Sequence, residues 1–153
     1  MITLFYATQT GNARDCAERL GRQLDSHHFP NRLIDLANYS ADQLREETLA
    51  LFVVSTYGEG EPPDDAVTFH ASLAKMPAGS LAQLRYSVFA LGDIDYVLFC
   101  GFGHDCDEFL SRAGAVRLLE VEECNLDQDK RLSGWLNRLL PLLYAARSLE
   151  SAG

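Results

Sequence analysis

Residues 8–13 combine the residue types that bind an anion at the start of a helix. They read Thr-Gln-Thr-Gly-Asn-Ala and join an apolar run, Ile2–Ala7, to a segment with helical spacing of apolar residues, Asn12–Ser26. A helix N-terminus presents unpaired N–H groups, glycine lets the backbone approach an anion, and hydroxyl and amide side chains add hydrogen bonds. The segment therefore favours a phosphate cradle, with an ordinary capped turn as the alternative.

Two common nucleotide motifs do not fit this segment. The Walker loop requires Gly-x-x-x-x-Gly-Lys-Ser/Thr, and neither the lysine nor the spacing is present. The dinucleotide fingerprint requires Gly-x-Gly-x-x-Gly, of which only Gly11 is present. A single phosphate group is the best remaining fit.

Two further loops carry a tyrosine close to glycine. Residues 55–63 read Ser-Thr-Tyr-Gly-Glu-Gly-Glu-Pro-Pro, and residues 91–100 read Leu-Gly-Asp-Ile-Asp-Tyr-Val-Leu-Phe-Cys. The glycines indicate close approach to a flat ligand, and the rings of Tyr57 and Tyr96 are of a type that stacks on heterocycles. Each loop taken singly also fits a surface turn, and from its residue type alone Phe99 is expected in the core.

An alternation of short apolar runs and helical patterns must position these loops. Strands are predicted at residues 2–7, 31–36, 48–55, 86–91 and 116–121, and helices at residues 12–26, 41–47, 64–76, 103–113 and 127–147, the last kinked or shortened by Pro141. This pattern predicts an α/β fold, a five-stranded parallel sheet with helices on both faces, in one domain, residues 1–153. Because ligands bind outside the carboxyl ends of such strands, we expect all three loops at one sheet edge.

Composition narrows the class of partner. The 153 residues include 13 Lys and Arg against 22 Asp and Glu, a formal net charge of −9, and no basic stripe that would suit a nucleic acid. No apolar run approaches the ~20 residues of a membrane span. The four cysteines, Cys16, Cys100, Cys106 and Cys124, have no Cys-x-x-Cys spacing, so reduced thiols in a cytoplasmic protein and no metal site are expected.

Together the three loops resemble those of the flavodoxins, and most closely the FMN domain of the diflavin reductases, such as the sulfite reductase flavoprotein and NADPH–cytochrome reductase. The resemblance covers nearly the whole chain and implies FMN as the cofactor, with Tyr57 and Tyr96 stacked on opposite faces of the isoalloxazine ring. The phosphate would be held by Thr8, Gln9, Thr10, Gly11, Asn12 and Ala13. The ring and ribityl chain would contact Ser55, Thr56, Gly58, Gly60, Leu91, Gly92, Asp93, Phe99, Cys100 and Glu122.

The resemblance also implies electron transfer. Reductases of this family continue into FAD and NADPH domains, whereas this sequence ends at Gly153 and starts its first strand directly after Met1. This favours a free-standing monomeric carrier of the cindoxin type, which takes electrons from a flavin-type reductase and passes them to a haem protein, a bacterial haem-thiolate monooxygenase. The alternatives are an excised FMN domain of a diflavin reductase and a flavin-dependent NAD(P)H quinone reductase. A phospho-receiver is disfavoured because Ser55 stands where its acceptor aspartate belongs.

Acidic residues surround the predicted flavin edge. They are Glu59, Glu61, Asp64, Asp65, Asp93, Asp95 and Glu122. Negative charge there opposes an anionic reduced flavin and attracts a basic docking face on the haem partner, with a solvated rim as the alternative. Ile94 and Asp95 depart from the small polar residues that the family usually has at these positions, so no contact is predicted from their side chains. Cys100 is expected to pack rather than to act as a redox thiol.

Overall fold

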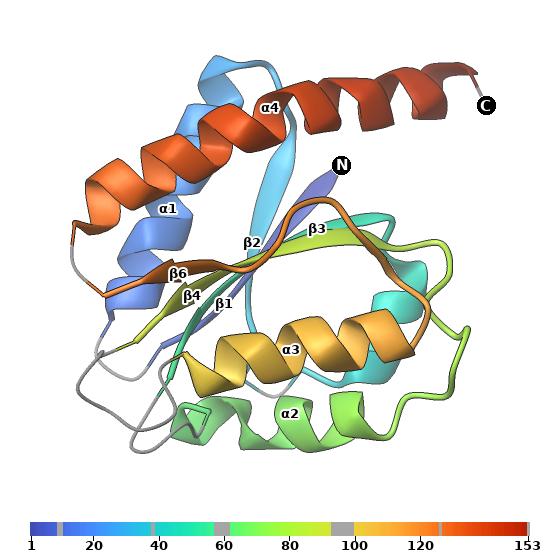
Figure 1. Ribbon diagram of the computed structural model, residues 1–153. Helices are drawn as coiled ribbons and strands as arrows, with labels where there is room; N and C mark the ends of the chain where they lie inside the picture. Colours follow the sequence, from blue (N-terminus) through green and yellow to red (C-terminus); the bar gives the residue numbers. More distant parts are fainter. Residues whose placement is uncertain (9–10, 38, 57–61, 93–99, 126, 153) are drawn as a thin grey trace.

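The computed structural model describes residues 1–8, 11–37, 39–56, 62–92, 100–125 and 127–152, in which strands and helices alternate (Figure 1). The strands are β1 (Ile2–Ala7), β2 (Asn31–Asp35), β3 (Leu49–Ser55), β4 (Arg85–Leu91), β5 (Val116–Arg117) and β6 (Glu122–Cys124). The helices are α1 (Asn12–Ser26), α2 (Val67–Ala74), α3 (Gly101–Arg112) and α4 (Gln128–Ala152), with two 3₁₀ segments, η1 (Ala41–Glu46) and η2 (Asp64–Ala66).

The sheet is parallel throughout and has the order β2-β1-β3-β4-β5, with β6 also paired to β4. The central strand β3 is buried from Leu49 to Val54, as its continuous apolar run predicts for a strand covered on both faces. Order and direction confirm the predicted doubly wound α/β fold.

The fifth position in the sheet differs from the prediction of one strand at residues 116–121. β5 pairs with Arg85 and Tyr86, and β6 pairs with the stretch from Phe89 to Leu91. Between these pairings β4 advances three residues, from Tyr86 to Phe89, while the edge chain advances five, from Arg117 to Glu122. Two extra residues therefore interrupt the strand like a bulge. The interruption is what brings β6 alongside the carboxyl end of β4.

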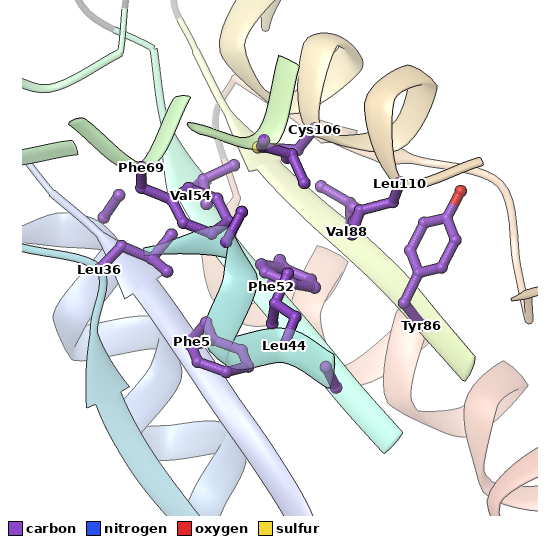
Figure 2. Close-up of a cluster of buried hydrophobic side chains, with 14 of the residues drawn as sticks. Phe5, Leu36, Leu44, Phe52, Val54, Phe69, Tyr86, Val88, Cys106 and Leu110 are labelled. Atoms are coloured by element: carbon purple, nitrogen blue, oxygen red, sulfur yellow. The ribbon is translucent and has the colours of Figure 1, made fainter. Parts of the chain in front are cut away.

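Two helical layers cover the sheet, α1 and α4 on one face and α2 and α3 on the other (Figure 1). Side chains alternate between the faces, so Phe5, Phe52 and Val88 belong to the cluster beneath α2 and α3, which Figure 2 shows. Leu51 and Phe89, each next to one of these residues, belong to the cluster beneath α1 and α4. Both faces of the sheet are therefore packed against helices, and this packing holds the strands in place up to their carboxyl ends.

Helices α1 and α4 follow the predicted apolar spacing, with one correction in α4. The predicted helix at residues 41–47 is instead the 3₁₀ segment η1, and that at residues 64–76 divides into η2 and α2, in which Val67 is exposed. In α1 the buried residues recur at the helical spacing expected for Asn12–Ser26 and include Ala13, Cys16, Ala17, Leu20 and Leu24. In α4 the buried residues include Trp135, Leu136, Leu139 and Leu143. The prediction that Pro141 shortens this helix is wrong, because α4 continues through Pro141 to Ala152. Pro141 lies on the exposed side, where the carbonyl that loses its N–H partner can be hydrated.

Candidate functional site

Three loops of the chain start at one edge of the sheet. β1 ends at Ala7, which pairs with Val54, and β3 ends at Ser55, which pairs with Leu91 at the end of β4. The three strands are parallel neighbours, and therefore the segments that follow them leave the sheet at the same carboxyl edge.

A hydrogen bond joins the two described ends of the segment between β1 and α1. The backbone N–H of Gly11 donates to Thr8 Oγ1 at 2.8 Å, and Gly11 precedes α1 with a φ of 93°, which glycine adopts without strain. A Cβ placed on Gly11 would meet no heavy atom within 4 Å, so the positive φ and not crowding is the reason for glycine here. Asn12 is exposed and Ala13 is buried. Gln9 and Thr10 lie outside the described residues.

The end of β3 is tied to both of its neighbours. The Thr56 N–H donates to the Leu91 carbonyl at 2.9 Å, and Thr56 Oγ1 accepts the Phe102 N–H at 3.2 Å. Thr56 therefore supplies a hydroxyl cap from a distant part of the chain, since Cys100, which directly precedes α3, makes no side-chain cap bond. Ser55 is half-buried beside it. Tyr57, Gly58 and Gly60 lie outside the described residues.

The end of β4 is anchored by β6. The Gly92 N–H donates to the Cys124 carbonyl at 2.9 Å, and Leu91 is buried. At the far end of the loop, Cys100 is buried with a φ of 57°, and its thiol donates to the Ala90 carbonyl at 3.3 Å. Burial raises the pKa of Cys100 to about 12, which fits packing and not a reactive thiolate. Asp93, Tyr96 and Phe99 lie outside the described residues.

Glu122 is the first residue of β6, and its side chain contacts two arginines of α4. Its carboxylate forms ion pairs with Arg131, at 3.4 Å between Oε2 and Nη1, and with Arg138. Glu122 pairs with Phe89, two residues before the end of β4. The ribityl contact expected of Glu122 stays a prediction, and in this structure its partners are the two arginines.

Two features near this edge were not predicted from the sequence. A Cβ on Gly103 would lie 2.4 Å from the Ala90 Cβ. At this point α3 is therefore closer to β4 than a residue with a side chain at position 103 would allow. The Gly-Phe-Gly at residues 101–103, directly after a strand and loop, was the available signal. His104 Nε2 lies 2.8 Å from Glu123 Oε2 and links α3 to β6. Nothing in the spacing of these two residues predicts that contact.

The described acidic residues near the edge are few because most of the predicted ones lie outside the described part of the chain. Asp64 and Asp65 form the exposed start of η2. Within the described ranges, no group of three or more His, Cys, Asp or Glu is placed to hold a metal ion. None of the helices in the described part combines the length and hydropathy that a bilayer crossing requires.

The donors at this edge fit a ligand with one phosphate. The N-terminus of α1 suits a phosphate, because the unpaired N–H groups of a first helical turn and the helix dipole both favour an anion. The loops after β3 and β4, held together through Thr56 and Leu91, border the same edge. Fold and edge thus define an α/β protein that binds a phosphorylated ligand outside its strand ends.

Comparison with known proteins gives the family. The flavodoxin family model matches residues 4–135, and the chain belongs to the flavodoxin family. It is an FMN-binding electron-transfer domain, so the cofactor that the loops predict is confirmed. A solved flavodoxin of Streptococcus pneumonia TIGR4 is 25% identical, with a TM-score of 0.76 over 90% of this chain and 96% of that one. A short-chain flavodoxin associated with a non-canonical PDU bacterial microcompartment, 22% identical, shares the fold with a TM-score of 0.77 over 93% and 99%.

Curated relatives agree with the predicted branch of the family. The sulfite reductase [NADPH] flavoprotein alpha-component of Shewanella sp. (strain MR-7) is 43% identical over 97% of this chain and 25% of its own length. That of Bacillus subtilis (strain 168) is 41% identical over 95% of this chain and 24% of its own length. The chain thus spans about a quarter of the length of these relatives.

Proposed function

We propose that this chain carries electrons from a flavin reductase to a haem protein, a bacterial haem-thiolate monooxygenase, as a monomeric, single-domain, cytoplasmic carrier. FMN supplies the redox chemistry when bound, since a flavin accepts an electron pair and can release the electrons singly. The residues of the chain bind this group, orient it and set the charge around it.

The proposed binding residues are those on the three loops. In the proposal, Thr8, Gly11 and the N–H groups of α1 bind the phosphate, and Tyr57 and Tyr96 enclose the ring. The remaining contacts come from Gln9, Thr10, Asn12, Ala13, Ser55, Thr56, Gly58, Gly60, Leu91, Gly92, Asp93, Phe99 and Cys100. The observation that supports this set best is the bond between the Thr56 N–H and the Leu91 carbonyl, because it holds two of the loops together where they leave the sheet.

Acceptor recognition in this proposal rests on negative charge at the flavin edge. The net charge of −9 favours encounter with a basic surface, and Asp64 and Asp65 are exposed beside the loop that follows β3. Such redox complexes are small and short-lived, so charge acts mainly on the rate of association.

A second candidate is the FMN domain of a longer flavoprotein. It is supported by the 43% identity to a sulfite reductase flavoprotein of which this chain spans only a quarter. In that case the donor would be a FAD domain of the same polypeptide. The site would be the same, and only the donor would differ.

Rapid mixing tests the carrier proposal. The FMN-loaded protein, reduced with dithionite, is mixed with a basic ferric cytochrome, and each electron transferred converts one ferric haem to ferrous haem. We expect the double variant Asp64→Asn, Asp65→Asn to slow this reaction several-fold at low salt and to have little effect at high salt.

The matched control removes two acidic residues elsewhere. Asp42→Asn with Glu46→Gln makes the same change in net charge on η1, which precedes β3 and therefore lies at the opposite end of the sheet. Equal slowing by both double variants would contradict acceptor docking at the flavin edge.

A further inference from the structure

A groove of about 490 Å³ lies between β6 and the first half of α4. Its lining is mostly charged and consists of Glu122, Asp127, Lys130, Arg131, Gly134 and Arg138. Three basic and two acidic residues line it, which gives the groove a net positive charge on a chain whose net charge is −9.

The groove has a carboxylate on its floor and guanidinium groups on its wall. The Glu122 side chain is only 12% exposed, whereas those of Arg131 and Arg138 are 59% and 58% exposed. Each arginine carries five N–H donors, so the contacts with Glu122 leave most of them directed to solvent. The contact that Glu122 makes shows which group these arginines bind, namely a carboxylate between two guanidinium groups.

Gly134 keeps the groove open. Arg131, Gly134 and Arg138 share one face of α4, because residues three and four apart in a helix are neighbours. A Cβ on Gly134 would meet no heavy atom within 4 Å, so alanine would fit there and would favour the helix by about 0.5–1 kcal/mol. Packing therefore does not require glycine at position 134, and the missing side chain leaves room between Arg131 and Arg138.

We propose that this groove docks an acidic segment of a partner protein, whose carboxylates bind Arg131, Arg138 and Lys130. The stretch of α4 from Lys130 to Arg138 extends about 12 Å, the length of roughly three to four residues of extended peptide. A single small oxyanion would fill only a fraction of 490 Å³. The segment binds by contacts within the groove, because the net charge of the chain repels an acidic partner at long range.

This docking site stands whether or not the chain is an electron carrier, because none of its basic residues belongs to the proposed FMN site. It also selects a different partner. A haem protein with a basic face suits the acidic residues near the flavin edge, whereas the exposed arginines of the groove suit an acidic segment.

Binding of a fluorescein-labelled hexaglutamate peptide, measured by fluorescence anisotropy at low salt, tests the proposal. We expect Arg131→Gln with Arg138→Gln to weaken binding about tenfold, as two lost charge-assisted contacts would. The control, Arg22→Gln with Arg45→Gln, removes two exposed arginines elsewhere and should change the affinity less than twofold. Equal losses in the two double variants would overturn the proposal.

Two single variants decide the matter if the double variant does not fold. Glu122→Gln frees both guanidinium groups and should strengthen binding several-fold more than Glu108→Gln, which makes the same charge change on exposed α3 surface. Gly134→Leu fills the groove without changing the charge and should weaken binding several-fold. Unchanged affinity in both variants would overturn the proposal. So would equally tight binding of inorganic sulfate or of a single-stranded hexathymidylate, because each would show a general anion site.

Discussion

At the scale of single residues, two glycines within helices have opposite surroundings. Gly103 starts the close contact of α3 with β4, where a Cβ would lie 2.4 Å from the Ala90 Cβ. Gly134 lies on the exposed face of α4, where a Cβ would meet nothing within 4 Å. The same substitution is therefore expected to have opposite effects on stability at the two positions.

Gly103→Ala should lower the free energy of unfolding by about 1–3 kcal/mol, because the added methyl group forces α3 away from β4. Gly134→Ala should raise it by about 0.5–1 kcal/mol, because alanine loses less backbone entropy in a helix. Urea unfolding followed by circular dichroism measures both. A Gly103→Ala protein as stable as the parent would contradict the close contact, and a destabilised Gly134→Ala protein would contradict the open face.

At the scale of elements, the site depends on how β3, β4 and α3 are joined. Thr56 makes both connections, its N–H to the Leu91 carbonyl and its Oγ1 to the Phe102 N–H. The Thr56 hydroxyl thus caps α3 through the N–H of Phe102, 46 residues further along the chain. The bond between the Phe102 N–H and Thr56 Oγ1 joins the start of α3 to the end of β3.

Thr56→Val keeps the shape of the side chain and removes the oxygen. We expect it to lower the free energy of unfolding by about 1 kcal/mol, the usual cost of a lost N-cap. Thr56→Ser keeps the oxygen and should retain most of that stability. Thermal unfolding of the three proteins compares them, and equal losses in the valine and serine variants would show that the hydroxyl does not cap α3.

Elements whose partners are nearby in sequence could be predicted, and those set by distant partners could not. β1 and α1 have the predicted bounds, because a buried apolar run and a clear helical period specify them locally. The split of the fifth strand depends on its register against β4, which no local pattern of residues 116–121 encodes. The passage of α4 through Pro141 likewise depends on tertiary burial of Trp135 and Leu139, which outweighs the missing N–H.

The same distinction applies to the site. The turn at Thr8 and Gly11 could be predicted because its chemistry lies within six consecutive residues. The contact between His104 and Glu123 and the ion pairs of Glu122 with Arg131 and Arg138 could not, since each joins different elements. Glu122 illustrates this most clearly, because its position near the edge is compatible with a cofactor contact and only the neighbouring helix reveals its partners.

At the scale of the whole molecule, the buried thiols link stability to pH. All four cysteines are buried, and burial raises the pKa of each, that of Cys124 to about 11. The folded protein therefore holds thiol protons that the unfolded chain releases from about pH 9 upward. The free energy of unfolding therefore keeps its full value below pH 9 and falls as the pH rises from 9 toward 11.

Cys124→Ala should reduce the slope of this loss between pH 9 and 11 by about 1.4 kcal/mol per pH unit, the contribution of one proton. Urea unfolding at several pH values measures the slope. Val88→Ala is the control, since it truncates an equally buried side chain that does not titrate, and it should lower stability equally at every pH. An unchanged slope in Cys124→Ala would mean that this thiol already ionises in the folded protein.

The function proposed for the whole molecule depends on FMN binding at the carboxyl edge of the sheet through its phosphate. Titration of the flavin-free protein with FMN and with riboflavin, followed by the quenching of flavin fluorescence, tests this directly. We expect one FMN bound per chain and an affinity for riboflavin at least about 100-fold lower, because riboflavin lacks the phosphate for which we propose the N-terminus of α1 as the binding site. No quenching with FMN, or equal affinities for the two flavins, would contradict it.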